Sequence, residues 1–237
     1  MSFVDGSAVN VALPIVQREL GASSASMQWV IEAYALFMAA LLLLGGALGD
    51  LYGRRKLFVI GIAIFAAASA SCAFAPNVAV LIVARCVQGV GAALSVPESL
   101  ALLSASYQGA ARGRAIGTWS AFASLTGALG PVIGGWLAEH VTWRAVFVIN
   151  VPLAMLVIAI SVLRVPESRD DDEPRTLDFA GAALATIGLG ALTAGLIAAQ
   201  GGHPGALGTG AIVLGVTVAP AAGISVAALV LAVAVLL

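Results

Sequence analysis

Long apolar runs separated by short polar turns are the main pattern of this sequence. A helix that crosses a membrane needs about 20 mostly apolar residues. Eight runs approach that length, the first of them short and the last unusually long: Ser2–Val16, Gln28–Gly49, Leu57–Ala75, Val78–Leu103, Ala115–Ala138, Val146–Leu163, Phe179–Ala199 and Leu207–Leu237. The pattern therefore predicts an all-α, polytopic membrane bundle whose first span lacks its beginning.

Composition agrees with the bilayer as the main solvent. Of the 237 residues, 61% are hydrophobic and 10% are charged, with a mean hydropathy of +1.05. A soluble domain carries roughly 25% charged residues. Cys72 and Cys86 both lie in apolar runs and are interpreted as packing residues rather than as a disulfide or metal site. His140 and His203 fall in outer loops, so we find no Ser/His or metal cluster and expect no enzyme and no nucleic-acid partner.

The distribution of basic residues predicts the orientation of the spans. If the N-terminus faces the cytoplasm, eight basic residues fall in cytoplasmic loops and two, Arg18 and Arg144, in outer loops. The eight are Arg54, Arg55, Lys56, Arg112, Arg114, Arg164, Arg169 and Arg175. Cytoplasmic loops are enriched in Lys and Arg, so a multi-pass protein of the cytoplasmic membrane with its N-terminus inside is favoured.

One polar stretch divides the chain. Residues 164–178 contain Pro166, Pro174 and four consecutive acidic residues, and no charged residue follows Asp178. We interpret this stretch as a solvated cytoplasmic linker rather than a docking segment. It separates a six-span half, residues 1–163, from two further spans in residues 179–237.

Charged residues inside a span usually face a cavity or a partner. At about 1.5 Å per residue, Arg85 lies roughly 12 Å and Asp5 roughly 16 Å from the outer ends of their spans. The two opposite charges thus lie at similar depth, and we expect a pair or a shared cavity. Arg85 stays ionised, whereas Asp5 can gain or lose a proton. The alternative is that Arg85 only ties helices together. Glu32 and Glu98 are two further acids within the spans, and for them the alternative to a cavity is a position at the membrane interface.

Two glycine-rich segments predict close helix contacts. Gly127, Gly130 and Gly134 fall on nearly one helix face, and Pro131 permits a bend beside them. The turn Gly46–Lys56 places Gly53 beside charged residues, so Asp50 could pair with Arg54 or with the basic residues before the fifth span. The candidate latch consists of Gly46, Asp50, Gly53, Arg54, Arg55, Lys56, Arg112 and Arg114.

An ordered set of motifs resembles the major facilitator superfamily, specifically its 14-span drug:proton antiporter branch. The matching segments are Asp5–Pro14 with Ser7 where Thr is usual, Gly46–Lys56, Leu81–Gly91, Gly127–Gly135, Thr142–Pro152 and Asp178–Leu184. The resemblance implies proton coupling through Asp5 and Arg85. It also implies an antiporter helix formed by Gly127, Gly130, Pro131, Gly134 and Gly135.

The resemblance further implies export of hydrophobic or amphipathic drugs, cationic ones included, driven by the proton gradient without another cofactor. A wide apolar cavity is expected, with Asn10, Gln88 and Glu32 as candidate polar lining. Because a full member carries 14 spans, we expect a truncated chain whose second half is missing. The alternatives are a non-transporting fragment that needs a complementary transporter half, and a carrier of another metabolite on the same fold.

Overall fold

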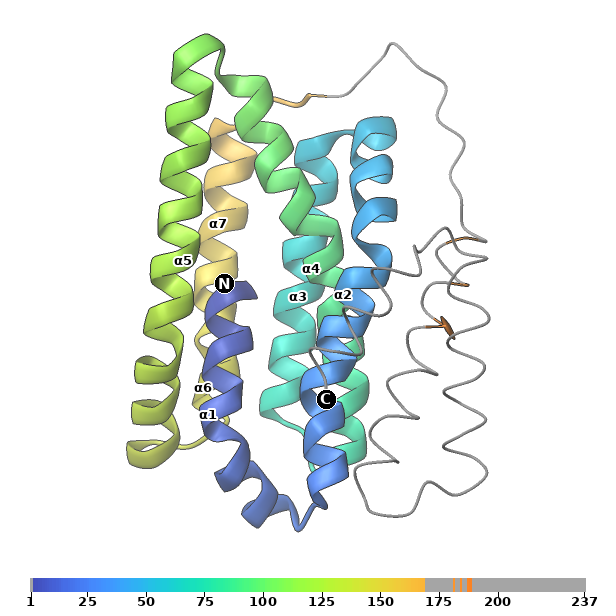
Figure 1. The fold of residues 1–237 in the computed structure, drawn as a ribbon, viewed down its shortest axis with the longest axis vertical. Coiled ribbons are helices and arrows are strands. Elements are labelled where there is room, and N and C mark those ends of the chain that lie inside the picture. Colours follow the sequence, from blue (N-terminus) through green and yellow to red (C-terminus); the bar gives the residue numbers. More distant parts are fainter. Residues whose placement is uncertain (1, 169–180, 182–183, 185–186, 189–237) are drawn as a thin grey trace.

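The computed structural model describes residues 2–168 together with residues 181, 184, 187 and 188, and it places the first of these ranges in a helical bundle (Figure 1). No strand occurs among the described residues. Residues 2–168 form seven helices, listed here in chain order: α1 (Ser2–Leu20), α2 (Ser24–Tyr52), α3 (Arg54–Ala73), α4 (Val78–Ser106), α5 (Gly109–His140), α6 (Ala145–Val148) and α7 (Asn150–Arg164). The predicted all-helical class is confirmed.

Five of the helical segments in the described residues are long and apolar enough to cross a membrane, with α6 and α7 together counting as one, Ala145–Arg164. Each is longer than the apolar run that predicted it. Hydropathy marks only the part of a helix in the hydrocarbon layer, whereas the helix itself continues into its polar ends. The predicted linker beyond Ser168 and the predicted spans Phe179–Ala199 and Leu207–Leu237 lie outside the described residues, apart from the four isolated positions.

Local sequence explains where the helices begin and turn. The side chain of Ser23 accepts a 3.2 Å hydrogen bond from the amide of Ser26, and Asn77 caps α4 by accepting from the amide of Val80 at 3.0 Å. These caps satisfy donors that the first turn of a helix leaves free. Between α2 and α3 the chain reverses at Gly53, whose φ of 108° favours glycine.

The helices pack in two groups. In the first, α4 lies against both α2 and α3 along most of its length, and glycines bring the backbones together. A Cβ atom at Gly45 would meet the backbone of Ala93, and one at Gly91 would meet the backbone of Phe65. In the second group, α1 lies along α5, while α4 and α5 have little mutual contact. Helix α1 starts at about half the height of the bundle (Figure 1).

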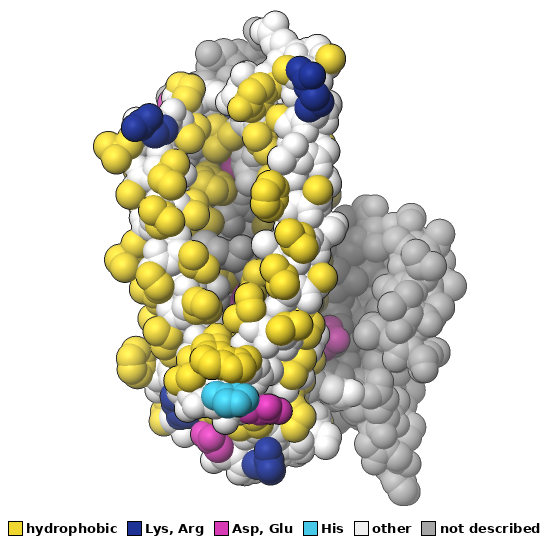
Figure 2. All heavy atoms as spheres, turned by 90° about the vertical axis from the view of Figure 1, so that its left-hand side faces the viewer, with side chains coloured by type: hydrophobic (Ala, Val, Ile, Leu, Met, Phe, Trp, Pro, Cys, Tyr) yellow, Lys and Arg dark blue, Asp and Glu magenta, His cyan; other side chains and the backbone are white. Residues whose placement is uncertain are grey.

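The outward faces of the bundle are apolar. Figure 2 shows hydrophobic side chains over most of the height of one face, with charged side chains gathered near its two ends. On α5 the exposed apolar side chains include Phe122, Leu125, Val132 and Trp136. Lipid tails can solvate such a surface and water cannot, so the bundle is a multi-pass membrane protein.

Candidate functional site

A buried ion pair joins α1 to α4 in the middle of the bundle. The guanidinium of Arg85 donates through one terminal nitrogen to Oδ2 of Asp5 at 2.5 Å. Both residues are 1% exposed. The pair predicted from matching depth along two spans is therefore present. A charge in a bundle interior is stable only when it is paired and hydrogen-bonded, and here each charge supplies the other's partner.

Arg85 has three further contacts. Its Nε donates a 3.0 Å hydrogen bond to the backbone carbonyl of Val30 on α2, and the nitrogen that binds Asp5 also donates to Oε1 of Gln88 at 2.8 Å. The guanidinium carbon lies 4.2 Å from the ring centroid of Tyr34. A planar guanidinium suits this combination of hydrogen bonds and ring stacking. Arg85 therefore stays anchored to α2 and α4 even without Asp5.

Three neutral side chains complete the network around Asp5. Its Oδ1 accepts hydrogen bonds from the amides of Gln88 at 3.0 Å and Asn150 at 2.8 Å. Asn150 also donates to the hydroxyl of Ser69 at 3.0 Å, and Ser69 donates to the carbonyl of Phe147 at 3.0 Å. Gln88 was predicted as polar lining of a substrate cavity, and here it bonds to Arg85 and Asp5. Ser69 and Asn150 were not predicted as site residues.

The network joins four helices around one carboxylate. Asp5 on α1 binds Arg85 and Gln88 on α4 and Asn150 on α7, and Ser69 brings in α3. A carboxylate accepts all three bonds, but a protonated carboxyl has lost the charge that holds Arg85. The arginine itself cannot release a proton at any relevant pH.

A second polar cluster, here called the latch, lies at the end of the bundle where α2 turns into α3. It consists of Asp50, Gly53, Arg54, Arg55, Glu167 and Ser168. Arg54 binds Oδ1 of Asp50 through two nitrogens, at 2.9 and 2.7 Å.

The segment after α7 closes the latch. The amide of Arg54 donates to the carbonyl of Ser168 at 2.9 Å, and the amide of Arg55 donates to Oε1 of Glu167 at 2.9 Å. The guanidinium of Arg55 also donates to the carbonyl of Val165 at 3.0 Å. These bonds tie the end of the sixth predicted span to the turn between the second and third.

The structure gathers only part of the predicted latch. Asp50 pairs with Arg54, which was one of the three partners considered. Lys56, Arg112 and Arg114 are exposed, and no described contact joins Arg112 or Arg114 to Asp50. Gly46 lies against Pro97 of α4, where an added Cβ would be 3.7 Å away, and so belongs to the helix contact instead. The sequence did not predict the contribution of Glu167 and Ser168.

The glycines of α5 divide between two environments. Gly130 and Gly134 are buried against α1, and Cβ atoms there would meet Ser7 and Ala8 respectively. A Cβ atom at Gly135 would lie 3.3 Å from Val11, whereas one at Gly127 would meet nothing within 4 Å. Helix α5 continues through Pro131 as one helix. The glycine face that was predicted to be continuous is thus a contact for α1 over Gly130–Gly135 only.

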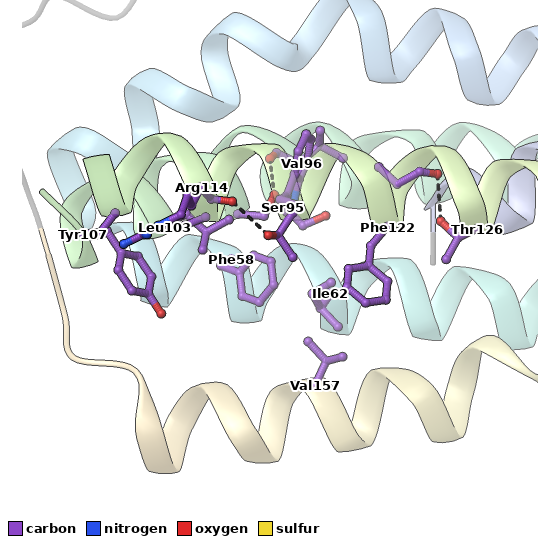
Figure 3. Close-up of a pocket in the computed structure, with 16 residues that line it drawn as sticks. Phe58, Ile62, Ser95, Val96, Leu103, Tyr107, Arg114, Phe122, Thr126 and Val157 are labelled. Atoms are coloured by element: carbon purple, nitrogen blue, oxygen red, sulfur yellow. Dashed lines mark hydrogen bonds between the residues drawn. The ribbon is translucent and has the colours of Figure 1, made fainter. Parts of the chain in front are cut away.

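A cavity of about 740 Å³ is lined by side chains of α3, α4, α5 and α7 (Figure 3). Most of its lining is apolar, including Phe58, Ile62, Phe122 and Val157. The lining residues of α5 extend from Ala111 to Thr126 and precede the part of that helix in contact with α1.

The three residues expected to line a substrate cavity do not line this one. Gln88 is part of the ion-pair network, Asn10 is exposed on α1, and Glu32 is half-buried on α2. The cavity's polar lining comes instead from side chains that were not singled out for it: Ser95, Ser99, Tyr107, Arg114, Thr118, Trp119 and Thr126. Sequence spacing cannot show which way each helix is rotated, and rotation decides which face meets a cavity.

At the opposite end of the bundle from the latch, a third set of contacts joins α1 to the α5–α6 connection. The indole of Trp143 donates to Oε2 of Glu19 at 2.7 Å, and Arg144 lies 3.5 Å from the same oxygen. Arg144 also donates to the carbonyl of Ala75 at 3.2 Å. Trp143 is fully buried. We call Glu19, Trp143, Arg144 and Ala75 the outer clasp, after the side of the membrane predicted for them from the basic residues.

No group of three His, Cys, Asp or Glu side chains in the described part of the chain could hold a metal ion. Cys72 and Cys86 are free cysteines.

The membrane-crossing helical bundle with a buried charged pair at its centre defines a polytopic membrane protein. The chain belongs to the Major Facilitator Superfamily, whose family model matches residues 1–236. A solved structure, a bacterial homologue of the human lysosomal transporter Spinster in an inward-facing and unoccupied conformation, superposes with a TM-score of 0.54 at 22% identity. The match covers 93% of this chain and 56% of that one, and it supports the fold alone.

Curated relatives carry names that refer to drug resistance. The chain is 40% identical over 198 residues to the multidrug resistance protein Stp of Mycobacterium tuberculosis, covering 83% of this chain and 37% of that protein. It is 40% identical over 200 residues to the methylenomycin A resistance protein of Bacillus subtilis, covering 83% and 42%. It is 37% identical over 199 residues to the tetracenomycin C resistance and export protein of Streptomyces glaucescens, covering 84% and 37%. The chain thus spans less than half the length of these relatives.

Proposed function

We propose that this chain forms the N-terminal part of an exporter that exchanges protons for hydrophobic or amphipathic drugs. The observation that carries the proposal is the buried pair of Asp5 and Arg85, in which one partner can be protonated and the other cannot. The names of the relatives, which refer to resistance to several chemically different compounds, support the drug class.

The coupling step follows from the bonds around Asp5. As a carboxylate, Asp5 holds α1 against α4 and α7 through Arg85, Gln88 and Asn150. When a proton binds to Asp5, Arg85 keeps its bonds to Val30 and Gln88, so its charge remains partly satisfied. The loss of this ion pair then weakens the link between α1 and α4. A proton that Asp5 takes up from one side of the membrane thereby changes the packing of α1.

The remaining parts of the proposal concern placement and partners. We place the protein in the cytoplasmic membrane with the latch and the N-terminus inside, because the basic residues concentrate at the latch end. Lipids, protons and small hydrophobic or cationic molecules are its partners, and the proton gradient supplies the energy. Residues 1–163 act as the first transporter half, with residues 164–178 as the linker to the spans in residues 179–237.

A second candidate function is a non-transporting part that works only with a complementary half. The observation in its favour is that the chain spans 37 to 42% of the three relatives above. Facilitator transport uses two halves that rock about a site at the midplane. In this reading Asp5 and Arg85 form half of a coupling site, and transport requires the rest of the protein in the same membrane.

Efflux of ethidium from energised cells tests both candidates. The chain is expressed alone and together with the remaining segment of the Stp relative. Efflux that requires a proton gradient and disappears in Asp5→Asn and Arg85→Ala, but persists in the exposed-carboxylate control Glu139→Gln, supports proton-coupled export. Efflux only upon co-expression supports the second candidate. Undiminished efflux in both site variants would overturn the coupling role.

A further inference from the structure

Glu98 on α4 is a buried acid that the network around Asp5 does not use. Its exposed fraction is 0%, and within residues 2–168 neither of its carboxyl oxygens has a hydrogen-bond partner. Asp5, by comparison, accepts bonds from three side chains. An ionised carboxylate without water or donors costs far more free energy than a neutral carboxyl in the same place. The surroundings of Glu98 therefore suit its protonated form.

Backbone from α2 lies directly against this carboxyl group. A Cβ atom at Gly49 would collide with the carboxyl carbon and both oxygens of Glu98. Gly49 comes immediately before Asp50, and its carbonyl accepts the 2.8 Å hydrogen bond from the amide of Gly53. The residue that covers Glu98 is thus bonded to the turn of the latch.

The charged groups around Glu98 come from three elements. Asp50 from α2, Arg54 from α3 and Glu167 from the segment after α7 all interact with it electrostatically. Asp50 and Glu167 oppose a negative charge at Glu98, and Arg54 favours one. The guanidinium of Arg54 is already bound to Asp50 by two hydrogen bonds. A charged Glu98 would have to compete with Asp50 for that arginine.

We propose that Glu98 is a second proton-binding site of this protein, occupied while the latch is closed and emptied as the latch opens. When α2 moves away from Glu98, water reaches the carboxyl group, its O–H bond breaks, and the proton passes to water on the latch side of the membrane. The carboxylate left behind competes with Asp50 for Arg54 and repels Glu167, which disfavours closing again. Low pH on the latch side therefore stabilises the closed latch.

This site is separate from the one at Asp5. The inference relies on the proposed function only for the orientation that places the latch in the cytoplasm, and it does not need Asp5 to couple transport. In that orientation Glu98 senses cytoplasmic pH, whereas Asp5 lies near the middle of the bundle. With both sites, the protein would respond to cytoplasmic pH through Glu98, independently of the protons that cross the membrane by way of Asp5.

Infrared spectroscopy of the chain in lipid measures the proton on Glu98 directly. A protonated carboxyl group has a carbonyl stretch that a carboxylate lacks. At neutral pH we expect such a band in the unmodified chain, its loss in Glu98→Gln, a shifted band in Glu98→Asp, and no change in Glu139→Gln. Circular dichroism checks that each variant keeps its helix content. If the band is absent, or unchanged in both Glu98 variants, the proposal fails whether or not the protein transports drugs.

Hydrogen–deuterium exchange at the latch tests the second part. Amide exchange over residues 50–58 is compared between the unmodified chain and Glu98→Gln at each pH, so that the intrinsic pH dependence of exchange cancels in the ratio. We expect equal exchange at acidic pH and several-fold faster exchange in the unmodified chain at alkaline pH, where only it can ionise. Glu139→Gln should follow the unmodified chain throughout. A ratio that stays constant with pH would overturn the link between Glu98 and the latch.

Discussion

The side-chain amide of Asn150, the first residue of α7, donates a 2.8 Å hydrogen bond to the carboxylate of Asp5 on α1. The two residues are separated by 145 positions in the sequence, and Asn150 is 1% exposed. The sixth predicted span is therefore bonded to Asp5 of the first predicted span. The same amide also binds Ser69 on α3, so it holds three helices at one point.

Removing this amide tests the link. We expect Asn150→Ala to destabilise the bundle by about 1–3 kcal/mol, because Asp5 and Ser69 each lose a buried partner. Thermal unfolding in detergent measures the change. Gln108→Ala is a matched control, since that exposed amide makes no capping hydrogen bond. Equal melting temperatures for Asn150→Ala and the control would show that the bond contributes nothing.

The ion pair of Asp5 and Arg85 should show strong non-additivity. Removing one partner leaves a buried charge alone, which costs about 3–5 kcal/mol, while removing both leaves no charge. We expect Asp5→Asn and Arg85→Gln each to destabilise strongly, and the double variant to be more stable than the sum of the two changes. Denaturant titration of all four proteins gives the coupling energy. Simple additivity would contradict a direct pair.

Two glycines in the same helix provide a test of the α1–α5 contact. In Gly134→Ala the new methyl group would meet the backbone of Ala8, which cannot rotate away, and we expect a loss of about 1–3 kcal/mol. In Gly127→Ala the methyl group meets nothing within 4 Å. Alanine is the better helix former by about 1 kcal/mol, so this variant should be neutral or slightly more stable. Unfolding midpoints of the two variants decide the matter, and a reversed order would be incompatible with the contact.

The latch depends on an acidic residue beyond the end of α7. We expect Glu167→Ala to weaken the latch by about 0.5–1.5 kcal/mol, because the amide of Arg55 and its guanidinium both lose a partly exposed partner. Trypsin should then cleave the turn at Arg54–Lys56 several-fold faster. Glu139→Ala, which removes an exposed carboxylate on α5, should leave the cleavage rate unchanged. No acceleration in Glu167→Ala would mean that the segment after α7 does not close the latch.

Much of the fold follows from hydropathy. A run of about 20 apolar residues in lipid must satisfy its own backbone hydrogen bonds, and a helix does so. The pair of Asp5 and Arg85 was also predictable, because a charge inside a span needs a partner and depth can be counted along each helix. Ser69 and Asn150 could not be found in this way. A neutral polar residue in a span, unlike a charged one, does not signal that a partner must be nearby. Nothing in the sequence therefore distinguishes the neutral residues that bind Asp5.

The predicted latch residues that do not join the latch, and the predicted lining residues that lie outside the cavity described above, have a common physical origin. Basic residues concentrate in cytoplasmic loops for reasons of topology, so charge alone could not separate Arg54 and Arg55, which bind, from Lys56, Arg112 and Arg114, which are exposed. The rotation of α1 and α2 decides whether Asn10 and Glu32 face a cavity, and rotation is set by packing against neighbours. Glu98 illustrates the same limit, because an acid near a span end is interfacial or buried depending on the helix beside it.

The division of the helices into two groups has a mechanical consequence. Glycine contacts hold α2 and α3 to α4, and others hold α1 to α5, so that neither group can slide internally without a collision of backbone atoms. Between the groups, the bonds around Asp5 and the bond from Arg144 to the carbonyl of Ala75 are donated by side chains, which can exchange partners while the helices stay intact. We therefore expect residues 2–168 to move as two rigid bodies that pivot at the outer clasp. Protonation of Asp5 would then tilt α1 and α5 together instead of displacing all the spans as one block.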